Sequence, residues 1–352
     1  MIKRSDTRAI QVGNIQIGGQ DKVIIQSMTN TKTADIEATL KQINDLIDHG
    51  CQLVRLAIFD DLDAAAIKEI KKNCSIPLIA DIHFDYRLAL TVLENGIDKV
   101  RINPGTIQDK DKVRLVVESC RTHQVPIRIG INGGSLPTDI LTKYKHPCPQ
   151  AMIEAAQKNV EILENLDFYD ICLSFKSSDP LMCVNAYLLA AKTFNYPLHL
   201  GVTEAGGFFT SSVRSSAALG ILLNAGIGDT IRVSVTGDPL WEIKIAKELL
   251  NCFDLMPNYP QLISCPGCGR LQYDMLAIVP EIEKHLETIK KPLTVAVMGC
   301  AVNGPGEARE ADIGIAGGKQ EALLFKKGEV IRKIKQENIL KELIEEIDNL
   351  TS

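Results

Sequence analysis

The sequence has no uninterrupted apolar run long enough to span a bilayer, although apolar residues make up 45% of the chain. Its first residues, MIKRSDTR, carry charges with no apolar stretch behind them, so they do not resemble a secretory signal. There is no excess of positive charge either, because 39 Lys and Arg face 44 Asp and Glu for a net charge of -5. That balance argues against a surface built for nucleic acid or anionic membrane. We therefore expect a cytoplasmic protein that binds neither nucleic acid nor membrane.

The ten cysteines show no disulfide framework. Seven are scattered singly and are expected to be mostly small buried hydrophobes: Cys51, Cys74, Cys120, Cys148, Cys172, Cys183 and Cys252. In a reducing compartment, the cysteines favour metal binding or free thiols over disulfides.

The remaining three cysteines have the spacing of a metal-cluster site. Cys265 and Cys268 are separated by two residues, and Cys300 begins a Gly/Pro-rich segment that ends at Glu307. A cluster must fit against bare backbone, which glycine allows. Spacing alone does not distinguish zinc from iron, and ordinary buried cysteines are the alternative.

The length of 352 residues suggests about two domains. Short β-rich runs alternate with helical patterns such as Asp35–His49, Ala151–Leu166 and Pro239–Cys252. The expected strands are Val23–Thr29, Gln52–Ile58, Leu78–His83, Lys99–Asn103, Ile127–Asn132, Ile171–Lys176, Leu198–Thr203 and Ile231–Val235. Eight βα units in about 230 residues predict an α/β fold with a TIM (β/α)8 barrel, and a doubly wound open sheet is the alternative.

The barrel is expected to occupy residues 1–255 and to bind the substrate. Residues 9–19 alternate around a turn and predict a hairpin at the bottom of the barrel. A linker rich in proline leads to a smaller α+β domain, residues 256–352, that carries the cysteine site. There we expect a helix Met275–Thr288, a strand Leu293–Met298, a hairpin around Gly328 and a final helix from Glu337.

Cationic side chains gather where the barrel strands end, which is where TIM barrels carry their chemistry. The four arginines and one lysine are Arg55, Arg101, Arg128, Arg232 and Lys176. Like charges in a low-dielectric mouth are stable only when anions accompany them, and arginine recognises oxyanions in a bidentate manner. The set predicts a phosphate or diphosphate ester as substrate, although any single arginine could instead pair with a neighbouring carboxylate. The other polar side chains expected at the mouth are Asp81, His83, Asn103, Asn132, Ser174, His199, Ser234 and Glu204.

Two other functions fit the same residues. Lys176 could form a Schiff base in an aldolase of phosphorylated sugars. Alternatively, the C-terminal domain could bind structural zinc or act as an iron–sulfur redox sensor on a ligand-binding barrel. Gly314–Lys319 is too short for a phosphate-binding loop.

Eight motifs, in order along nearly the whole chain, resemble the 4-hydroxy-3-methylbut-2-enyl diphosphate synthase family. They are Gln26–Thr29 (QSMT), Ala80–Phe84 (ADIHF), Arg101–Gly105 (RINPG), Arg128–Asn132 (RIGIN), Leu198–Gly207 (LHLGVTEAGG), Gly228–Ser234 (GDTIRVS), Cys265–Cys268 (CPGC) and Cys300–Ala308 (CAVNGPGEA). The chain passes directly from the eighth barrel helix to the cysteine segment, so it resembles the two-domain form of that family.

The resemblance implies an iron–sulfur oxidoreductase of the non-mevalonate isoprenoid pathway. Such an enzyme reductively opens 2-C-methyl-D-erythritol 2,4-cyclodiphosphate to (E)-4-hydroxy-3-methylbut-2-enyl diphosphate and water, with single electrons from flavodoxin or ferredoxin. It also implies a nitrite/sulfite reductase-like domain whose [4Fe-4S] cluster is held by Cys265, Cys268, Cys300 and Glu307. We expect the arginines to hold the diphosphate and Glu204 to protonate or orient the leaving hydroxyl.

Chain geometry favours a homodimer. The eighth helix, about 13 residues at ~1.5 Å each, carries the chain roughly 20 Å away from the mouth. A linker of about 10 residues spans at most ~35 Å, so reaching the mouth of its own barrel would strain it. We therefore expect a head-to-tail dimer in which the cluster of one chain covers the barrel of the other, as the family resemblance also implies.

Overall fold

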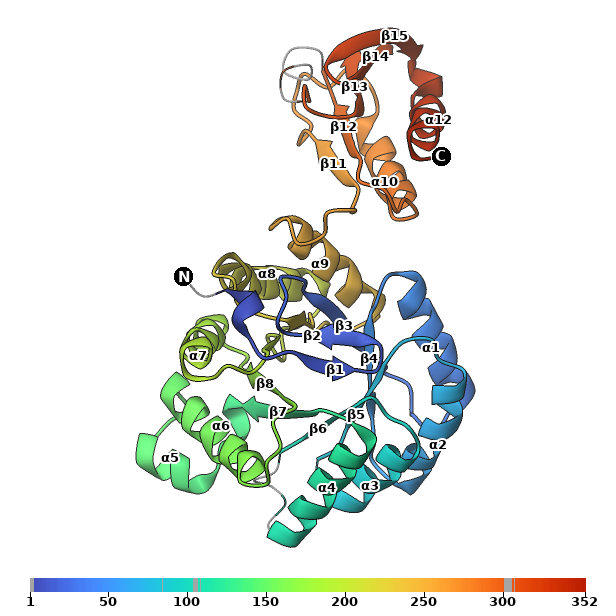
Figure 1. Cartoon of the computed structure of the whole chain (residues 1–352). Helices are drawn as coiled ribbons and strands as arrows, with labels where there is room; N and C mark the ends of the chain where they lie inside the picture. The colour runs from blue at the N-terminus through green and yellow to red at the C-terminus, as the bar shows by residue number, and fades with distance from the viewer. Residues whose placement is uncertain (1–2, 84, 104–106, 108, 301–305, 307) are drawn as a thin grey trace. The chain divides into compact units, whose positions relative to one another are not determined.

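The computed structural model describes residues 3–83, 85–103, 107, 109–300, 306 and 308–352. The chain forms two compact units, Met1–Leu255 and Met256–Ser352. None of the helices in these described ranges has the length and apolar character needed to cross a membrane. The two units are described separately below (Figure 1).

The first unit is a parallel eight-stranded barrel. Its strands are β3 (Ile24–Met28), β4 (Leu53–Ala57), β5 (Leu78–Asp81), β6 (Lys99–Ile102), β7 (Ile127–Asn132), β8 (Ile171–Lys176), β9 (His199–Leu200) and β10 (Thr230–Ile231). They are ordered β8-β7-β6-β5-β4-β3-β10-β9, and a parallel bridge between Leu173 and Leu198 joins the two ends of the sheet. The predicted TIM barrel is confirmed, and the open-sheet alternative is wrong because β8 and β9 meet.

Helices surround the strands (Figure 1). They are α1 (Ile36–Asp48), α2 (Asp61–Lys72), α3 (Tyr86–Glu94), α4 (Lys110–His123), α5 (Thr138–Tyr144), α6 (Pro149–Glu164), α7 (Pro180–Thr193), α8 (Phe208–Asn224) and α9 (Leu240–Asn251). An aspartate side chain accepts backbone N–H groups at the start of several of them, as Asp60 does for α2 and Asp179 for α7. The short helix α5 was not anticipated. Strands β9 and β10 are shorter than expected because the chain leaves the sheet there for loop contacts, such as Thr203 N–H to the carbonyl of Ser177 at 3.2 Å.

A hairpin closes the bottom of the barrel, as the sequence predicts. Strands β1 (Ile10–Val12) and β2 (Ile15–Ile17) pair antiparallel. Ile10, Val12 and Ile17 pack in one apolar cluster with the lower inward-facing residues of the barrel, Ile24, Leu53, Ile79 and Cys172. Burying these side chains gives the barrel an apolar floor.

The inward-facing side chains stack in layers, as expected when alternate strands of a barrel contribute to each level. The strand registers give a lowest layer of Leu53, Lys99, Cys172 and Thr230, and a middle layer of Gln26, Ile79, Arg128 and His199. The upper layer holds Arg55, Arg101, Ser174 and, just past the end of β10, Arg232. Most TIM barrels fill these layers with Val, Ile and Leu. Here, cationic and polar side chains reach down to the lowest layer.

The second unit is a five-stranded sheet with helices on one face. Its strands, in spatial order, are β11 (Gln261–Ser264), β12 (Thr294–Met298), β13 (Ile313–Gly318), β14 (Glu321–Lys326) and β15 (Glu329–Lys335). The first three are parallel, and β14 and β15 form the predicted hairpin. Helices α10 (Met275–Leu286) and α12 (Ile339–Thr351) bury Ile278, Ile282, Leu343 and Ile347 against the sheet.

Sequence patterning missed two strands of this unit. Gly314, Gly317 and Gly318 fall in β13 and obscure its strand pattern. Gly314 is required there, because a Cβ atom would lie 2.5 Å from the Phe325 ring and 2.7 Å from the Ala296 carbonyl oxygen. Strand β11 is short and half exposed, which leaves no clear alternation. The final helix begins at Ile339, after a 3-10 turn over Gln336–Asn338, slightly later than expected.

Candidate active site

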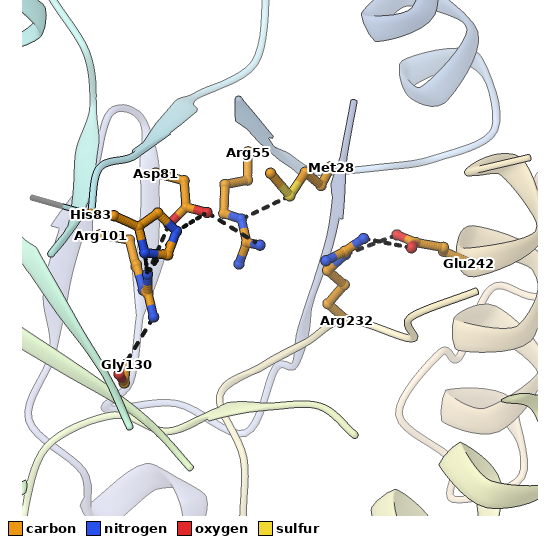
Figure 2. A network of polar contacts seen from close by, with 8 residues as sticks. All are labelled: Met28, Arg55, Asp81, His83, Arg101, Gly130, Arg232 and Glu242. Carbon is orange, nitrogen blue, oxygen red and sulfur yellow. Dashed lines mark hydrogen bonds and ion pairs between the residues drawn. The ribbon is translucent and has the colours of Figure 1, made fainter. Parts of the chain in front are cut away.

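Asp81, at the end of β5, organises the cations on one side of the barrel mouth (Figure 2). Its two carboxylate oxygens lie 3.5 Å from Arg55 Nη2 and 3.3 Å from Arg101 Nη1, and His83 Nε2 is 3.6 Å away. Burial alone would raise the pKa of Asp81, but Arg55, a hydrogen bond with His83 and Arg101 together hold that pKa well below its usual range. Asp81 is therefore a permanent anion that fixes two guanidinium groups.

Gly130 on β7 makes room for one of these guanidinium groups. A Cβ atom at this position would lie 2.7 Å from Arg101 Nε and 2.9 Å from Nη2. Arg101 Nη2 also donates to the Gly130 carbonyl oxygen at 3.5 Å. Glycine is thus required at position 130 because the Arg101 side chain passes so close to the backbone. It is not required by a turn in the backbone.

A second network holds Arg232 from another side of the mouth (Figure 2). Glu242 of α9 is buried and accepts Arg232 Nε at 3.0 Å and Nη2 at 2.7 Å. Ser27 Oγ donates to the same carboxylate at 2.7 Å. This bidentate pairing fixes the plane of the guanidinium. Sequence reasoning missed Glu242 because an acidic residue in the first turn of a helix carries no signal of its tertiary partner.

Arg128 lies deeper than the sequence suggests. It is 1% exposed in the middle layer, and its Nε and Nη1 atoms have no hydrogen-bond partner among the described residues. Burial and the neighbouring Arg101 lower the pKa of Arg128 to about 10, so it remains charged near neutral pH. A buried cation with free donors requires an anionic or polar ligand to satisfy it.

His199 was expected among the mouth residues but also lies in the middle layer. Its Nδ1 is 2.7 Å from Thr230 Oγ1, and its side chain is fully buried. Burial, then Arg128 and Lys176, hold the pKa of His199 well below its usual value. It therefore contributes a neutral imidazole to the site.

Lys176 and Ser174, on β8, complete the buried wall of the mouth. Lys176 passes close to Gly201, where a Cβ atom would lie 3.7 Å from its Nζ. Burial and the arginines around Lys176 hold the pKa of its amine well below the usual value. Asn132 is in register with Lys176 on the neighbouring strand β7.

Three further predicted residues lie at the ends of other strands. Asn103 follows β6 and is half-buried, and Ser234 follows β10, where its carbonyl accepts the hydroxyl of Ser211 at 2.8 Å. Glu204 is exposed in the loop after β9 and has a φ of 53°, the left-handed region that non-glycine residues seldom adopt. Strain of this kind is characteristic of functional loops.

Lys99 is a cation that sequence reasoning missed. It is fully buried on β6, and within the described ranges its Nζ has no hydrogen-bond partner. It precedes Arg101 by two residues and so shares the inward face of the strand. The alternation along β6 predicts an inward-facing side chain at Lys99. Its position at the first residue of the strand, away from the strand end that forms the mouth, gave no sign of a functional role.

Positive charge dominates the described part of the barrel interior. The cations are Arg55, Lys99, Arg101, Arg128, Lys176 and Arg232. Asp81 and Glu242 are the carboxylates paired with them among the described residues. The excess of positive charge, together with the free donors of Arg128, suits a ligand that carries several negative charges.

In the second unit, the three predicted ligand cysteines gather at one end of the sheet. Cys265 follows β11, and its Sγ accepts the backbone N–H of Gly299 at 3.3 Å. Cys300 follows β12, the strand beside β11. The turn containing Cys268 returns to the same place, where Gln272 N–H donates to the Gly299 carbonyl at 3.0 Å.

The surroundings of these cysteines suit an iron–sulfur cluster. A Cβ atom on Gly299 would lie 2.4 Å from Leu271 Cδ1, so the close packing of Leu271 beside Cys265 requires glycine here. The backbone N–H of Arg270, followed by its side chain, lowers the pKa of Cys268 and favours the thiolate that binds metal. No three His, Cys, Asp or Glu side chains within the described ranges form a single-ion site. A cluster binds one cysteine per iron, so its thiolates need not converge on one atom. Glu307, the predicted fourth ligand, lies outside the described residues.

Comparison with known proteins identifies relatives of both units. Residues 7–247 match the GcpE TIM-barrel domain, and residues 261–349 match the GcpE protein C-terminal domain. The 4-hydroxy-3-methylbut-2-en-1-yl diphosphate synthase (flavodoxin) of Anoxybacillus flavithermus is 54% identical over 350 residues, covering 99% of this chain and 96% of the relative. Proteins of the same name from Bacillus mycoides and Lysinibacillus sphaericus are also 54% identical, covering 99% of this chain and 95% and 94% of theirs.

Two solved structures resemble about 70% of this chain in fold. A 7,8-dihydropteroate synthase from Vibrio fischeri has a TM-score of 0.50 at 14% identity, covering 70% of this chain and 98% of its own. A spore coat polysaccharide biosynthesis protein from Bacillus subtilis has a TM-score of 0.51 at 11% identity, covering 70% and 74% of the two chains. At such low identity these similarities support the fold and carry no functional information.

Replacing Asp81 by asparagine is expected to lower the free energy of unfolding of the barrel unit by about 3 kcal/mol at pH 7. Removing one partner of a buried ion pair leaves the other charge uncompensated. The pKa of Asp81 is depressed in the folded state, so its contribution is present at neutral pH and is lost as the pH falls below about 4. Urea unfolding followed by circular dichroism should show a gap between the two proteins that narrows in acid.

Asp85→Asn is the matched control, because Asp85 makes an exposed ion pair with Arg87 at 2.7 Å. Exposed pairs of this kind contribute little to stability. Equal losses for the two variants at pH 7 would contradict the central role given to Asp81.

Proposed function

This chain belongs to the GcpE family of 4-hydroxy-3-methylbut-2-en-1-yl diphosphate synthases, and from that premise we propose how its residues carry out the reaction. The family resemblance found in the sequence motifs is confirmed. The protein is an iron–sulfur oxidoreductase of the non-mevalonate isoprenoid pathway. It converts 2-C-methyl-D-erythritol 2,4-cyclodiphosphate to (E)-4-hydroxy-3-methylbut-2-enyl diphosphate. The aldolase and the non-catalytic sensor are therefore set aside.

The observation that carries the proposal is the unbalanced positive charge of the barrel interior. Each phosphorus of a cyclic diphosphate carries one acidic oxygen, so the substrate is a dianion near neutral pH. Arg128 offers two free donors from the middle layer, and Arg55, Arg101 and Arg232 surround it from above. Planar guanidinium groups bind phosphate oxygens in pairs, which fixes the orientation of the ring as well as its position.

We assign the barrel residues to two roles. The cations Arg55, Arg101, Arg128, Lys176 and Arg232 bind the diphosphate. Asp81 and Glu242 hold guanidinium groups in place before the substrate arrives, which reduces the entropy lost on binding. The remaining polar residues, His83, Asn103, Asn132, Ser174, His199 and Ser234, provide neutral or adjustable hydrogen-bond partners around the sugar carbons.

We assign to Glu204 the role of protonating or orienting the leaving hydroxyl group. Loss of a hydroxyl as water requires a proton at that oxygen, and a carboxyl group at the rim can supply or position it. Glu204 is exposed at the end of a barrel strand, where catalytic residues of TIM barrels are found. Its left-handed φ aims the side chain in a direction that an ordinary extended loop would not.

A [4Fe-4S] cluster would be held by Cys265, Cys268, Cys300 and Glu307. The role of the chain is to position these ligands before the cluster binds. When bound, such a cluster supplies electrons one at a time. Flavodoxin is the proposed donor, since the curated relatives carry it in their names, and ferredoxin is the other candidate. A carboxylate at Glu307 would leave one corner of the cluster more exchangeable than a thiolate.

The rim of the barrel supports a shared active site. Large exposed apolar side chains lie near the starts of three helices that follow barrel strands. They are Phe59 (88% exposed) and Leu62 (71%) after β4, Leu181 (68%) after β8, and Phe209 (78%) after β9. Large apolar side chains grouped around a mouth mark an interaction surface. We propose that the cluster-bearing unit of a second copy covers this rim in a head-to-tail homodimer in the cytoplasm.

The function is tested by anaerobic assay of the reconstituted protein with the cyclodiphosphate and a chemical one-electron reductant. Wild-type protein is expected to release the linear diphosphate, and Cys300→Ser is expected to lose iron and at least about 100-fold in turnover because a ligand is missing. Cys252→Ser, which changes an exposed cysteine outside the ligand group, should keep both iron and activity. Absence of product from wild-type protein with an intact cluster would refute the proposal.

Glu204→Gln is expected to reduce turnover by about 100-fold while leaving the iron content and the substrate dissociation constant close to wild type. The amide retains the shape but cannot donate the proton, and general acid catalysis contributes about 100- to 10,000-fold. Turnover with dithionite isolates this step from the protein electron donor. Unchanged turnover with a full cluster would exclude the acid role.

Mixing Arg128→Ala with Cys300→Ser is expected to restore activity if the site is shared. In each heterodimer, one of the two sites combines an intact barrel with an intact cluster ligand set, so purified heterodimer should show up to about half of wild-type activity and a randomly exchanged equimolar mixture up to about a quarter. Two differently tagged variants purified in tandem would demonstrate subunit exchange. Exchange without any recovered activity would contradict the head-to-tail arrangement.

A further inference from the structure

Lys99 is the buried cation for which the proposed binding site has no role. It lies in the lowest layer of the barrel, two layers below the upper layer that contains Arg101, and Lys176 lies higher still. Its side chain is fully buried, and no hydrogen-bond partner from the part of the chain that the structure describes reaches its Nζ. An isolated buried ammonium is strongly unfavourable, so its presence must be explained by something above it.

The charged and titratable groups that act on Lys99 within the described residues provide no counterion. Cys172 on β8 is a buried thiol, and burial raises the pKa of Cys172, so that it stays uncharged. Arg128 on β7 and Arg55 on β4 repel Lys99, and His199 on β9 is a neutral imidazole within its field. The acting groups are thus either like-charged or neutral, and Asp81 is already committed to the arginines.

We propose that Lys99 is a positioning residue for the cyclic diphosphate, and that binding of this dianion in the mouth draws a proton onto the Lys99 amine. In the charged state Lys99 holds Arg128 upward by repulsion, toward the phosphates, and adds its field to theirs. This inference rests on the proposed function. It gives the mouth a second, buried source of positive charge, which above about pH 8 is complete only when the substrate is bound.

The direction of titration follows from the surroundings. Burial, and then repulsion from Arg128 and Arg55, lowers the pKa of Lys99 to about 8 in the substrate-free protein. A dianion above it favours the charged form and raises that pKa in the complex. Below about pH 8, Lys99 is protonated in both states and adds its full share to affinity. Between the two pKa values binding takes up a proton, and affinity falls as the pH rises.

The cyclodiphosphate does not titrate in this window because both of its acidic oxygens are already ionised. Proton uptake therefore reports on the protein. Lys176 is the other amine with a depressed pKa, so a variant must separate the two.

The test measures substrate binding to the unreduced holoenzyme, which binds the cyclodiphosphate without turnover. Titration calorimetry at about pH 7 and pH 9, in buffers of different ionisation enthalpy, gives the dissociation constant and the protons taken up. Wild-type protein is expected to take up more protons at pH 9 than at pH 7. Lys99→Met should weaken substrate binding at pH 7 about tenfold for each unit by which the substrate raises the pKa of Lys99. It should also lose the part of the proton uptake that Lys99 supplies.

A stability measurement separates positioning from a structural role. Without substrate, Lys99→Met removes an unpaired buried charge and should raise the melting temperature by about 2 °C or more, although it weakens binding. A residue needed only for packing would lower both. Lys41→Met, at an exposed position on α1, is the control and should change neither.

Lys99→Arg is the second variant, because a guanidinium stays charged throughout this pH range. It should keep binding within about threefold of wild type at pH 7 while losing the uptake that Lys99 supplies. Binding and uptake in Lys99→Met equal to wild type would overturn the inference, as would the absence of extra uptake by wild-type protein at pH 9. Failure of wild-type protein to bind the cyclodiphosphate at all would instead refute the proposed function.

Discussion

Positive charge buried inside a barrel is the constraint on which the rest of this structure depends. A cation removed from water needs a counter-charge, and the interior provides Asp81 and Glu242 for a larger set of arginines and lysines. Those two carboxylates do not neutralise the site. They hold Arg55, Arg101 and Arg232 in fixed positions and leave Arg128 with free donors. The substrate-free barrel is thus a preformed, under-neutralised anion site, and part of its stability is given up for binding.

The barrel tolerates this interior because its other surfaces are apolar. The β1–β2 hairpin covers the bottom with Ile10, Val12 and Ile17, and the helices bury the outer faces of the strands. Gly130 then gives Arg101 the space to lie across the neighbouring strand. The hairpin, the helices and the close packing at Gly130 all exclude water from the barrel interior. Exclusion of water strengthens the electrostatic attraction for a dianion.

The second unit meets a different requirement, which is to bring thiols from separate segments to one place. Parallel pairing of β11 and β12 places Cys265 and Cys300 at the same end of the sheet, and a tight turn returns Cys268 to them. Gly299 donates its backbone N–H to Cys265 Sγ, and Arg270 favours the thiolate of Cys268. A cluster held this way would be presented at the end of a rigid sheet, which suits electron exchange with a protein donor on one side and with substrate on another.

Local patterns along the chain were enough to identify the barrel, the family and the chemistry of the mouth. Periodicity marked eight strands with helices between them, and the charged strand ends identified Arg55, Arg101, Arg128 and Arg232 as a set. These patterns could not determine depth or partnership, because alternation tells which face a residue takes and not which layer or neighbour it meets. The folded chain places Arg128 and His199 below the mouth and pairs Glu242 with Arg232. It also shows that Lys99 is a buried amine with no hydrogen-bond partner among the described residues. The stagger between strands and the approach of distant helices, which no local pattern encodes, made those decisions.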